Sequence, residues 1–182
     1  KNDFCSASTP PLEGKRMLFA RYVSERKRKG KPLRISFVDI RKAYFNALPE
    51  RALFMRVPKE LGLTPNTVAR QVRCVYGTRD AAANFQKEVK ATMEKMGFKQ
   101  GKYSVSTYYH YERQLRVLVH GDDFVSSGSR EEAKWFKGEL EKRFQIKTKV
   151  IGTGPEKVKE ATVLNRVIRV TENGWEYEAD QR

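Results

Sequence analysis

The spacing of apolar residues changes several times along the chain and predicts three helices. Apolar residues recur every three or four positions in residues 15–29, in residues 79–96 and in a segment that starts at Ser129. Ser129 and Glu132 have the spacing of a capping box, which predicts the first residue of the third helix. Gly97 stands where a glycine commonly ends a helix, so the second helix is expected to stop there.

Short runs of apolar and β-branched residues predict strands before and between these helices. The runs are residues 33–40, 106–111, 115–119, 146–151 and 163–170, with residues 175–177 returning as a hairpin after a turn. In residues 33–40, Ile35, Phe37 and Asp39 share one face by the period of two, while Val38 and Ile40 share the other, so this strand is expected to be buried on both faces. Gly121 and Asp122 predict a tight turn after residues 115–119.

The order of these elements predicts an α+β fold, with helices packed on one face of a small antiparallel sheet. Residues 1–14 are expected to form a loop. Residues 46–72 contain three prolines and a glycine, and they predict an inserted subdomain of short strands and turns. The length of 182 residues suits one domain with a modest core.

The net charge of the chain indicates the class of its binding partner. The chain has 37 Lys and Arg against 22 Asp and Glu, a net charge of +15, and this excess predicts a polyanionic partner. The run of cations at residues 26–29 is explained either as a solvated helix end or as a nucleic-acid or nuclear-import segment. No apolar stretch approaches the roughly twenty residues that a membrane-spanning helix needs, so no membrane partner is expected.

The few cysteines and histidines limit which metal sites and disulfides the chain can form. Two cysteines and two histidines cannot form a zinc site at any familiar spacing. A Cys5–Cys74 disulfide and reduced thiols are the alternatives, and reduced thiols are the expectation for an intracellular protein. The chain begins without Met, and both ends read as the interior of a longer polypeptide, so a fragment is expected.

Two strand segments about eighty residues apart each end in carboxylates. One strand delivers Asp39, and the other leads through a turn to Asp122 and Asp123. Side by side, these strands would gather three carboxylates, which is costly unless cations lie between them. An oxygen-only cluster suits Mg²⁺, which completes its shell with water and substrate phosphates. A Gly-Asp-Asp turn alone is usually structural, but its place between two apolar strands favours a metal site.

The motifs resemble the reverse transcriptase of copia-type LTR retrotransposons over nearly the whole chain. Asp-Ile-Arg-Lys-Ala-Tyr-Phe-Asn-Ala at residues 39–47 is similar to the family's Asp-Val-Lys-Thr-Ala-Phe-Leu-Asn-Gly. Cys-Val-Tyr-Gly-Thr-Arg-Asp-Ala-Ala-Ala-Asn-Phe at residues 74–85 matches Ser-Leu-Tyr-Gly-Leu-Lys-Gln-Ala-Pro-Arg-Gln-Trp. Residues 96–99 match a Leu-Gly-Phe-Lys segment, and residues 120–123 match Tyr-Val-Asp-Asp.

The resemblance implies a polymerase palm, with residues 46–73 as a partial fingers insertion, that performs RNA- or DNA-templated DNA synthesis. It implies two Mg²⁺ ions, with Mn²⁺ as a substitute, on Asp39 and Asp122, and Asp123 as a supporting carboxylate. The implied partners are a primed RNA or DNA template, deoxynucleoside triphosphates and the rest of a Pol polyprotein. The implied location is a cytoplasmic particle or the nucleus.

The resemblance also implies roles for residues around the carboxylates. Tyr44 would stack under the deoxyribose and exclude a 2′-hydroxyl, although a packed aromatic is the alternative. The other implied contacts are to the nucleotide, from Ile40, Tyr44, Tyr76, Gly77 and Arg79, and to the primer, from Leu164 and Asn165.

Departures from the family pattern leave other functions open. His120-Gly121 replaces an aromatic–apolar pair, and Ala82 replaces a proline. The N-terminal fingers strands, thumb, connection and RNase H regions of the family are absent from these 182 residues. One alternative is an inactive relic of such an element. Another is a non-catalytic basic module that binds nucleic acid through its cations and Tyr103, Tyr108, Tyr109 and Tyr111.

Overall fold

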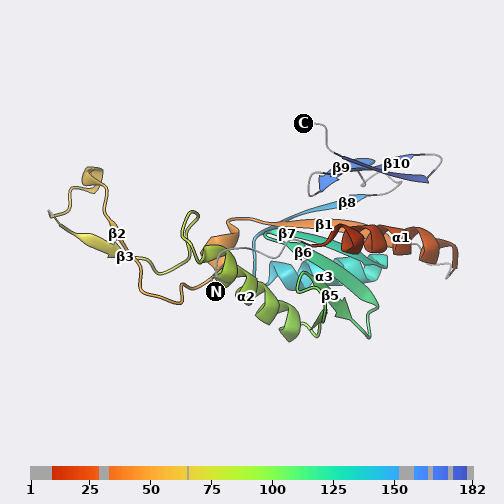
Figure 1. Ribbon diagram of the computed structural model, residues 1–182, viewed down its shortest axis with the longest axis horizontal. Coiled ribbons are helices and arrows are strands. Elements are labelled where there is room, and N and C mark those ends of the chain that lie inside the picture. Colours follow the sequence, from red (N-terminus) through yellow and green to blue (C-terminus); the bar gives the residue numbers. More distant parts are fainter. Residues whose placement is uncertain are drawn as a thin grey trace.

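The fold of the chain combines helices with antiparallel sheets (Figure 1). The computed structural model describes residues 10–28, 33–64, 66–151, 158–163, 166–171 and 174–179. The elements, in chain order, are α1 (Leu12–Arg28), β1 (Arg34–Ile40), the 3₁₀ helix η1 (Ala43–Asn46), β2 (Phe54–Arg56), the 3₁₀ helix η2 (Lys59–Leu61), β3 (Val68–Arg70), α2 (Ala81–Lys95), β4 (Lys99–Gln100), β5 (Thr107–His110), β6 (Leu115–His120), β7 (Asp123–Gly128), α3 (Arg130–Glu141), β8 (Ile146–Ile151), β9 (Glu160–Val163), β10 (Arg166–Thr171) and β11 (Gly174–Ala179).

A six-stranded sheet forms the centre of the molecule, in the order β4-β5-β6-β7-β1-β8. Each neighbouring pair in it is antiparallel. β1 comes early in the chain but lies between β7 and β8, which come much later. The α+β class expected from the element order is therefore confirmed, and the acidic ends of β1 and of the β6–β7 hairpin become neighbours.

Each face of this sheet carries its own core. On one face, α2 and α3 bury Phe85, Met93 and Phe136 against Val38 and Phe124 of the sheet. α1 packs instead on the other face together with the small sheet β11-β10-β9. The expectation that the helices share one face is therefore wrong.

The physical reason lies in the alternation along β1. Val38 and Ile40 point to the α2–α3 side, while Ile35 and Phe37 point to the opposite side. Both faces are thus apolar and both need cover. α1 supplies that cover on its side with Leu18, which is buried in the same core as Ile35.

Two segment boundaries also differ from expectation. α1 begins at Leu12, so residues 12–14 are helical rather than part of a loop. The run at residues 163–170 forms two strands, because β9 and β10 pair antiparallel with Val163 opposite Arg166. A single extended strand could not cover the α1 face in this way, whereas the pair and β11 place Ala161 and Ile168 in its core.

The described residues of 46–72 form short strands, turns and the 3₁₀ helix η2, largely as expected, and they project from the body as an arm (Figure 1). We define the arm as residues 54–70. The β2–β3 ribbon carries it, and the Gln71 amide donates a 2.8 Å hydrogen bond to the Leu53 carbonyl at its base. Five large apolar side chains of the arm are 44–63% exposed; they are Phe54, Met55, Leu61, Leu63 and Val68.

The remaining expectations concern the thiols and the membrane. Cys74 is a buried free thiol whose pKa is raised by burial, while Cys5 lies outside the described residues. In the described parts of the chain, no helix has the length and apolar character needed to cross a membrane.

Candidate active site at the end of the central sheet

The acidic ends of β1 and of the β6–β7 hairpin meet at one end of the central sheet. Asp39 of β1 lies directly opposite Asp123 of β7. One residue further on, the Ile40 amide donates a 3.0 Å hydrogen bond to the carbonyl oxygen of Asp122. This bond ties β1 to the tip of the hairpin, so the expected meeting of the two acidic segments is confirmed for the backbone.

A row of ionisable side chains crosses four strands at this end. His120 is opposite Asp123, Asp123 is opposite Asp39, and Asp39 is opposite Lys147 of β8. Residues that lie opposite each other in antiparallel strands share a face, so all four belong to the α1 face of the sheet. The two carboxylates at the centre of the row therefore have a basic residue on either side.

Asp122 lies in the turn that precedes β7. Gly121 and Asp122 are the two residues between the paired His120 and Asp123. Gly121 has a φ of 58°. A positive φ at the first central residue alone is the pattern of a type II′ turn, in which glycine is preferred. The sequence Gly-Asp-Asp thus places one carboxylate in a hairpin tip and the next at the start of a strand.

The electrostatics of Asp123 show that the three carboxylates interact. Burial raises the pKa of Asp123, and the charges of Asp122 and then Asp39 raise it further, while His120 lowers it. A raised pKa means that the ionised form is disfavoured here. A cation between these groups would relieve that repulsion.

A cavity of about 260 Å³ opens beside the row. Asp39 and Asp123 line it together with Lys147, Lys149 and Thr162, and its floor is formed by apolar residues of β1 and β7. Lys149 lies opposite Phe37, so both lysines share the α1 face with the carboxylates. The cavity therefore combines acidic groups with two cations that suit the phosphates of a nucleotide.

The donor set is of the kind that Mg²⁺ prefers, since all three groups are carboxylates. The repulsion of Asp123 by Asp122 and Asp39 is also consistent with a cation site, because a bound cation would offset it. Within the described residues, however, no group of three or more His, Cys, Asp or Glu side chains is close enough to hold a metal ion. The backbone thus brings the three residues together, while the chemistry of the donors, rather than a formed cluster, supports metal binding.

Two tyrosines lie next to the carboxylates. The rings of Tyr44 and Tyr76 are 4.5 Å apart between centroids, and Tyr44 also packs edge-on against Phe85. The pKa of Tyr76 is raised by burial and by the charge of Asp122, and lowered by hydrogen bonds with the backbone of Ala43 and Tyr44. Tyr76 therefore lies near both the hairpin tip and η1.

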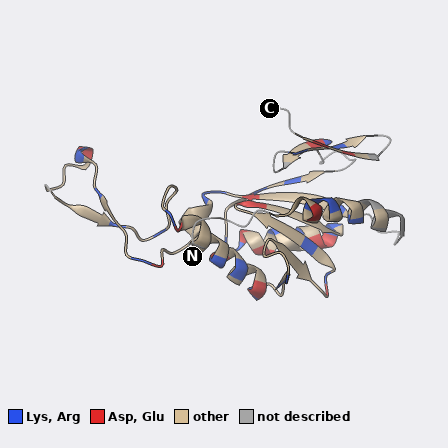
Figure 2. Ribbon diagram, in the orientation of Figure 1, with Lys and Arg blue, Asp and Glu red and all other residues tan. Residues whose placement is uncertain are grey.

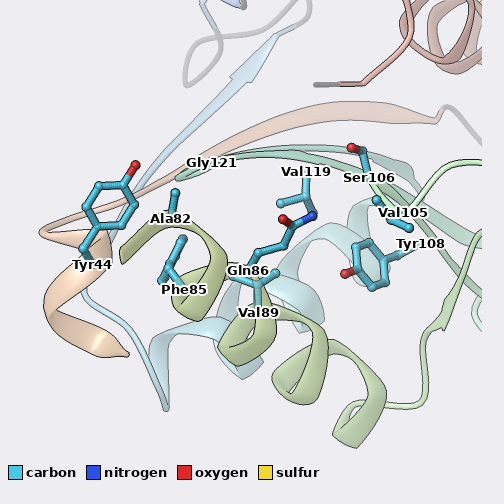
Figure 3. Close-up of a pocket in the computed structure, with 10 residues that line it drawn as sticks. All are labelled: Tyr44, Ala82, Phe85, Gln86, Val89, Val105, Ser106, Tyr108, Val119 and Gly121. Atoms are coloured by element: carbon cyan, nitrogen blue, oxygen red, sulfur yellow. The ribbon is translucent and has the colours of Figure 1, made fainter. Parts of the chain in front are cut away.

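A small pocket of about 20 Å³ joins Tyr44 to the residues that depart from the family pattern. Tyr44 lies at one end and Tyr108 at the other, with Gln86 between them, and both Ala82 and Gly121 line the wall (Figure 3). Tyr108 is buried and its pKa is raised to about 12 by burial. The tyrosine run of β5 is thus partly core, as its alternation indicates.

The other residues singled out from the sequence are less closely grouped. Gly77 has a φ of 89°, which explains the glycine by backbone conformation, and a Cβ at this position would have no described residue within 4 Å. Arg79 is exposed. Ile40 is buried, and its backbone amide is the group that contacts the hairpin. Leu164 and Asn165 lie outside the described residues.

Lys147 was not found from the sequence. It lies in a strand that has lysines at alternate positions, which indicates only an exposed strand face. Its position opposite Asp39 depends on β8 pairing with β1, and strand order of this kind is set by long-range packing. The sequence does hold one signal for this basic surface: Lys147 and Lys149 share one face of the predicted strand.

Comparison with known proteins agrees with the geometry. The family model described as "Reverse transcriptase (RNA-dependent DNA polymerase)" matches residues 12–153, which include both acidic segments and β8. No curated protein and no solved structure gives a significant match. Since the match spans most of the chain, the protein belongs to the reverse transcriptase family that is typical of copia-type LTR retrotransposons.

Proposed function

We propose that this chain is the palm of a retrotransposon reverse transcriptase and carries out RNA- and DNA-templated DNA synthesis at the carboxylate end of its central sheet. The observation that carries the proposal is the pairing of Asp39 with Asp123, together with the Ile40–Asp122 hydrogen bond, in a member of this family. The arm would be part of the fingers. The context would be a Pol polyprotein in a cytoplasmic particle or the nucleus.

Asp39, Asp122 and Asp123 would hold Mg²⁺, or Mn²⁺ in its place. The bound metal would supply positive charge for the triphosphate and lower the pKa of the primer 3′-hydroxyl. Among the chain's own groups, Lys147 and Lys149 line the same cavity and would attract the phosphates. The β6–β7 turn and the end of β1 would hold the carboxylates in fixed relative positions.

Tyr44 and Tyr76 would select the sugar and position the base. Their rings are in contact, so each restricts the other, and Phe85 supports Tyr44 from the core. A fixed ring under the sugar would exclude a 2′-hydroxyl by contact. Gly77 and Arg79 would border the same nucleotide, and Leu164 and Asn165 would lie near the primer.

The first test is extension of a primed RNA template in Mg²⁺ and in Mn²⁺. We expect Asp39→Asn and Asp122→Asn to reduce extension to background, because each removes a charged oxygen ligand. Glu141→Gln on α3 is the matched control, since it removes one exposed carboxylate from the other side of the sheet and should leave extension unchanged.

A second readout does not depend on turnover. Mg²⁺ that binds only the folded chain should raise its melting temperature, and the rise should disappear in Asp122→Asn. Folded protein that binds template but shows neither extension nor this rise would contradict the proposal. It would favour an inactive relic or a non-catalytic binding module.

A further inference from the structure

A cluster of two tyrosines and two cations lies at the opposite end of the central sheet from the carboxylates. Lys99 of β4 is opposite Tyr109 of β5, and Tyr109 is opposite Arg116 of β6, so the three form a row on one face. Tyr111 follows two residues after Tyr109, and their ring centroids are 4.6 Å apart. We call Lys99, Tyr109, Tyr111 and Arg116 the tyrosine patch.

Each cation of the tyrosine patch lies over a ring. The Arg116 guanidinium carbon is 4.9 Å from the centroid of Tyr109, and Lys99 Nζ is 5.3 Å from the centroid of Tyr111. Tyr111 is 61% exposed, and Lys99 is also exposed. The patch therefore presents positive charge and an open aromatic ring to solvent at the same place.

The charge around the patch indicates the sign of its partner. Residues 99–116 contain four Lys and Arg and a single acidic residue, Glu112. Arg113 is paired with Glu132, whereas no ion pair of Lys99 or of Lys102 occurs in the described ranges. Over the whole molecule, Lys and Arg are spread along α1, α2 and the arm (Figure 2). A polyanion is thus the complementary partner, and exposed rings among cations are the means by which proteins bind single strands.

The tyrosine patch is separate from the carboxylate site although both belong to the same face of the sheet. Arg116 and His120 are four positions apart on β6, which corresponds to about 13 Å along a strand. α1 covers the row between them, where Leu118 is buried in the α1 core. Binding at the patch therefore needs neither the carboxylates nor a metal ion.

We propose that the tyrosine patch is a binding surface for single-stranded nucleic acid, in which a base stacks on Tyr111 and phosphates contact Lys99 and Arg116. The proposal goes beyond the polymerase function and does not depend on it. The alternative is purely structural: β4 is a two-residue edge strand, lysines protect sheet edges, and the cross-strand pairs of Tyr109 with Lys99 and Arg116 stabilise the sheet.

The experiment measures binding of a fluorescent single-stranded RNA by anisotropy, in EDTA and in the Asp122→Asn background. We expect Tyr111→Ala to weaken binding by roughly fivefold or more, as loss of one stacked base does, and Tyr111→Phe to bind like the parent. We expect Lys99→Ala to reduce the slope of log binding constant against log salt concentration by about 0.7, because one phosphate contact is lost. Lys134→Ala, which removes an exposed lysine from α3 on the other face, should leave that slope unchanged.

The outcomes separate this proposal from the polymerase function. Equal affinities of Tyr111→Ala, Tyr111→Leu and the parent would overturn it and leave the patch as a protected sheet edge. Competition by poly-glutamate as strong as that by RNA at equal charge would also overturn it, because stacking would then contribute nothing. Loss of extension in Asp122→Asn with unchanged RNA binding would support it, and absence of extension in every variant bears only on the polymerase proposal.

Discussion

Asp123 is a residue whose ionised form costs the folded chain stability. Its carboxylate lies between Asp39 and His120 in the cross-strand row, and burial and the neighbouring carboxylates raise its pKa. The folded chain therefore holds this proton more tightly than the unfolded chain does. The stability that this group contributes is fully present below its unfolded pKa and is lost as the pH rises through its folded pKa.

We expect Asp123→Asn to be more stable than the parent at pH 7 in EDTA, because the amide carries no charge to repel. The gain should be no more than about 1 kcal/mol, since a half-exposed carboxylate is partly screened by solvent. Urea denaturation from acid to neutral pH measures it, and the difference between the two proteins should shrink as the pH falls.

Glu139→Gln serves as the control for Asp123→Asn, because it removes a carboxylate that is paired with Lys142 on α3. It should not become more stable than the parent at neutral pH. A difference for Asp123→Asn that stayed constant from acid to neutral pH would show that the repulsion among the three carboxylates is negligible.

At the scale of elements, the start of α3 depends on one side chain. Ser129 Oγ accepts a 3.2 Å hydrogen bond from the Glu132 amide, as the sequence predicts. The Glu132 carboxylate accepts a hydrogen bond from Arg113, which also stacks on Trp135. The cap therefore links α3 to the turn between β5 and β6.

We expect Ser129→Ala to lower the free energy of unfolding by about 1 kcal/mol, because an amide at the start of α3 loses its acceptor. Urea denaturation monitored by tryptophan fluorescence measures this, since Trp135 lies in the same helix. Ser129→Asp keeps an acceptor and should retain the parent's stability. A loss in Ser129→Asp equal to that in Ser129→Ala would mean that the hydroxyl acts through packing and not as a cap.

Local sequence patterns predicted individual helices and strands well. They predicted less well which strands pair and which face of the sheet each helix covers. The stripe of Phe85, Val89 and Met93 identified α2, and the Gly-Asp turn identified the β6–β7 hairpin, because both signals lie within a few residues. The three carboxylates were found for the same reason. The face covered by α1 and the position of Lys147 opposite Asp39 both depend on contacts between distant segments, which no local period encodes.

At the scale of the whole molecule, the arm and the body have different kinds of surface. Every residue of β2 is exposed, and β3 is largely so, whereas the central sheet has a buried core on each of its faces. A two-stranded ribbon of this kind contributes little stability by itself. Its exposed apolar side chains are typical of a surface that meets a partner.

We expect that replacing residues 54–70 with a short turn will leave the melting temperature of the body within a few degrees of the parent's. The reason is that the arm buries little against the sheet, and the Gln71–Leu53 hydrogen bond at its base is retained. Differential scanning fluorimetry measures this. A fall comparable to that of a core truncation such as Phe85→Ala, which should cost about 3–5 kcal/mol, would show that the arm supports the body.

The place of β1 between β7 and β8 also determines when the carboxylate site can exist during synthesis. A ribosome that has released Asp39 has not yet made either strand that pairs with it, and Ile151 must emerge before the sheet can close around β1. Contacts so distant in sequence form slowly, so the apolar faces of β1 stay exposed until its partner strands are made. The nascent chain therefore keeps β1 unpaired until β7 and β8 have been translated, and its apolar side chains are open to aggregation during that time.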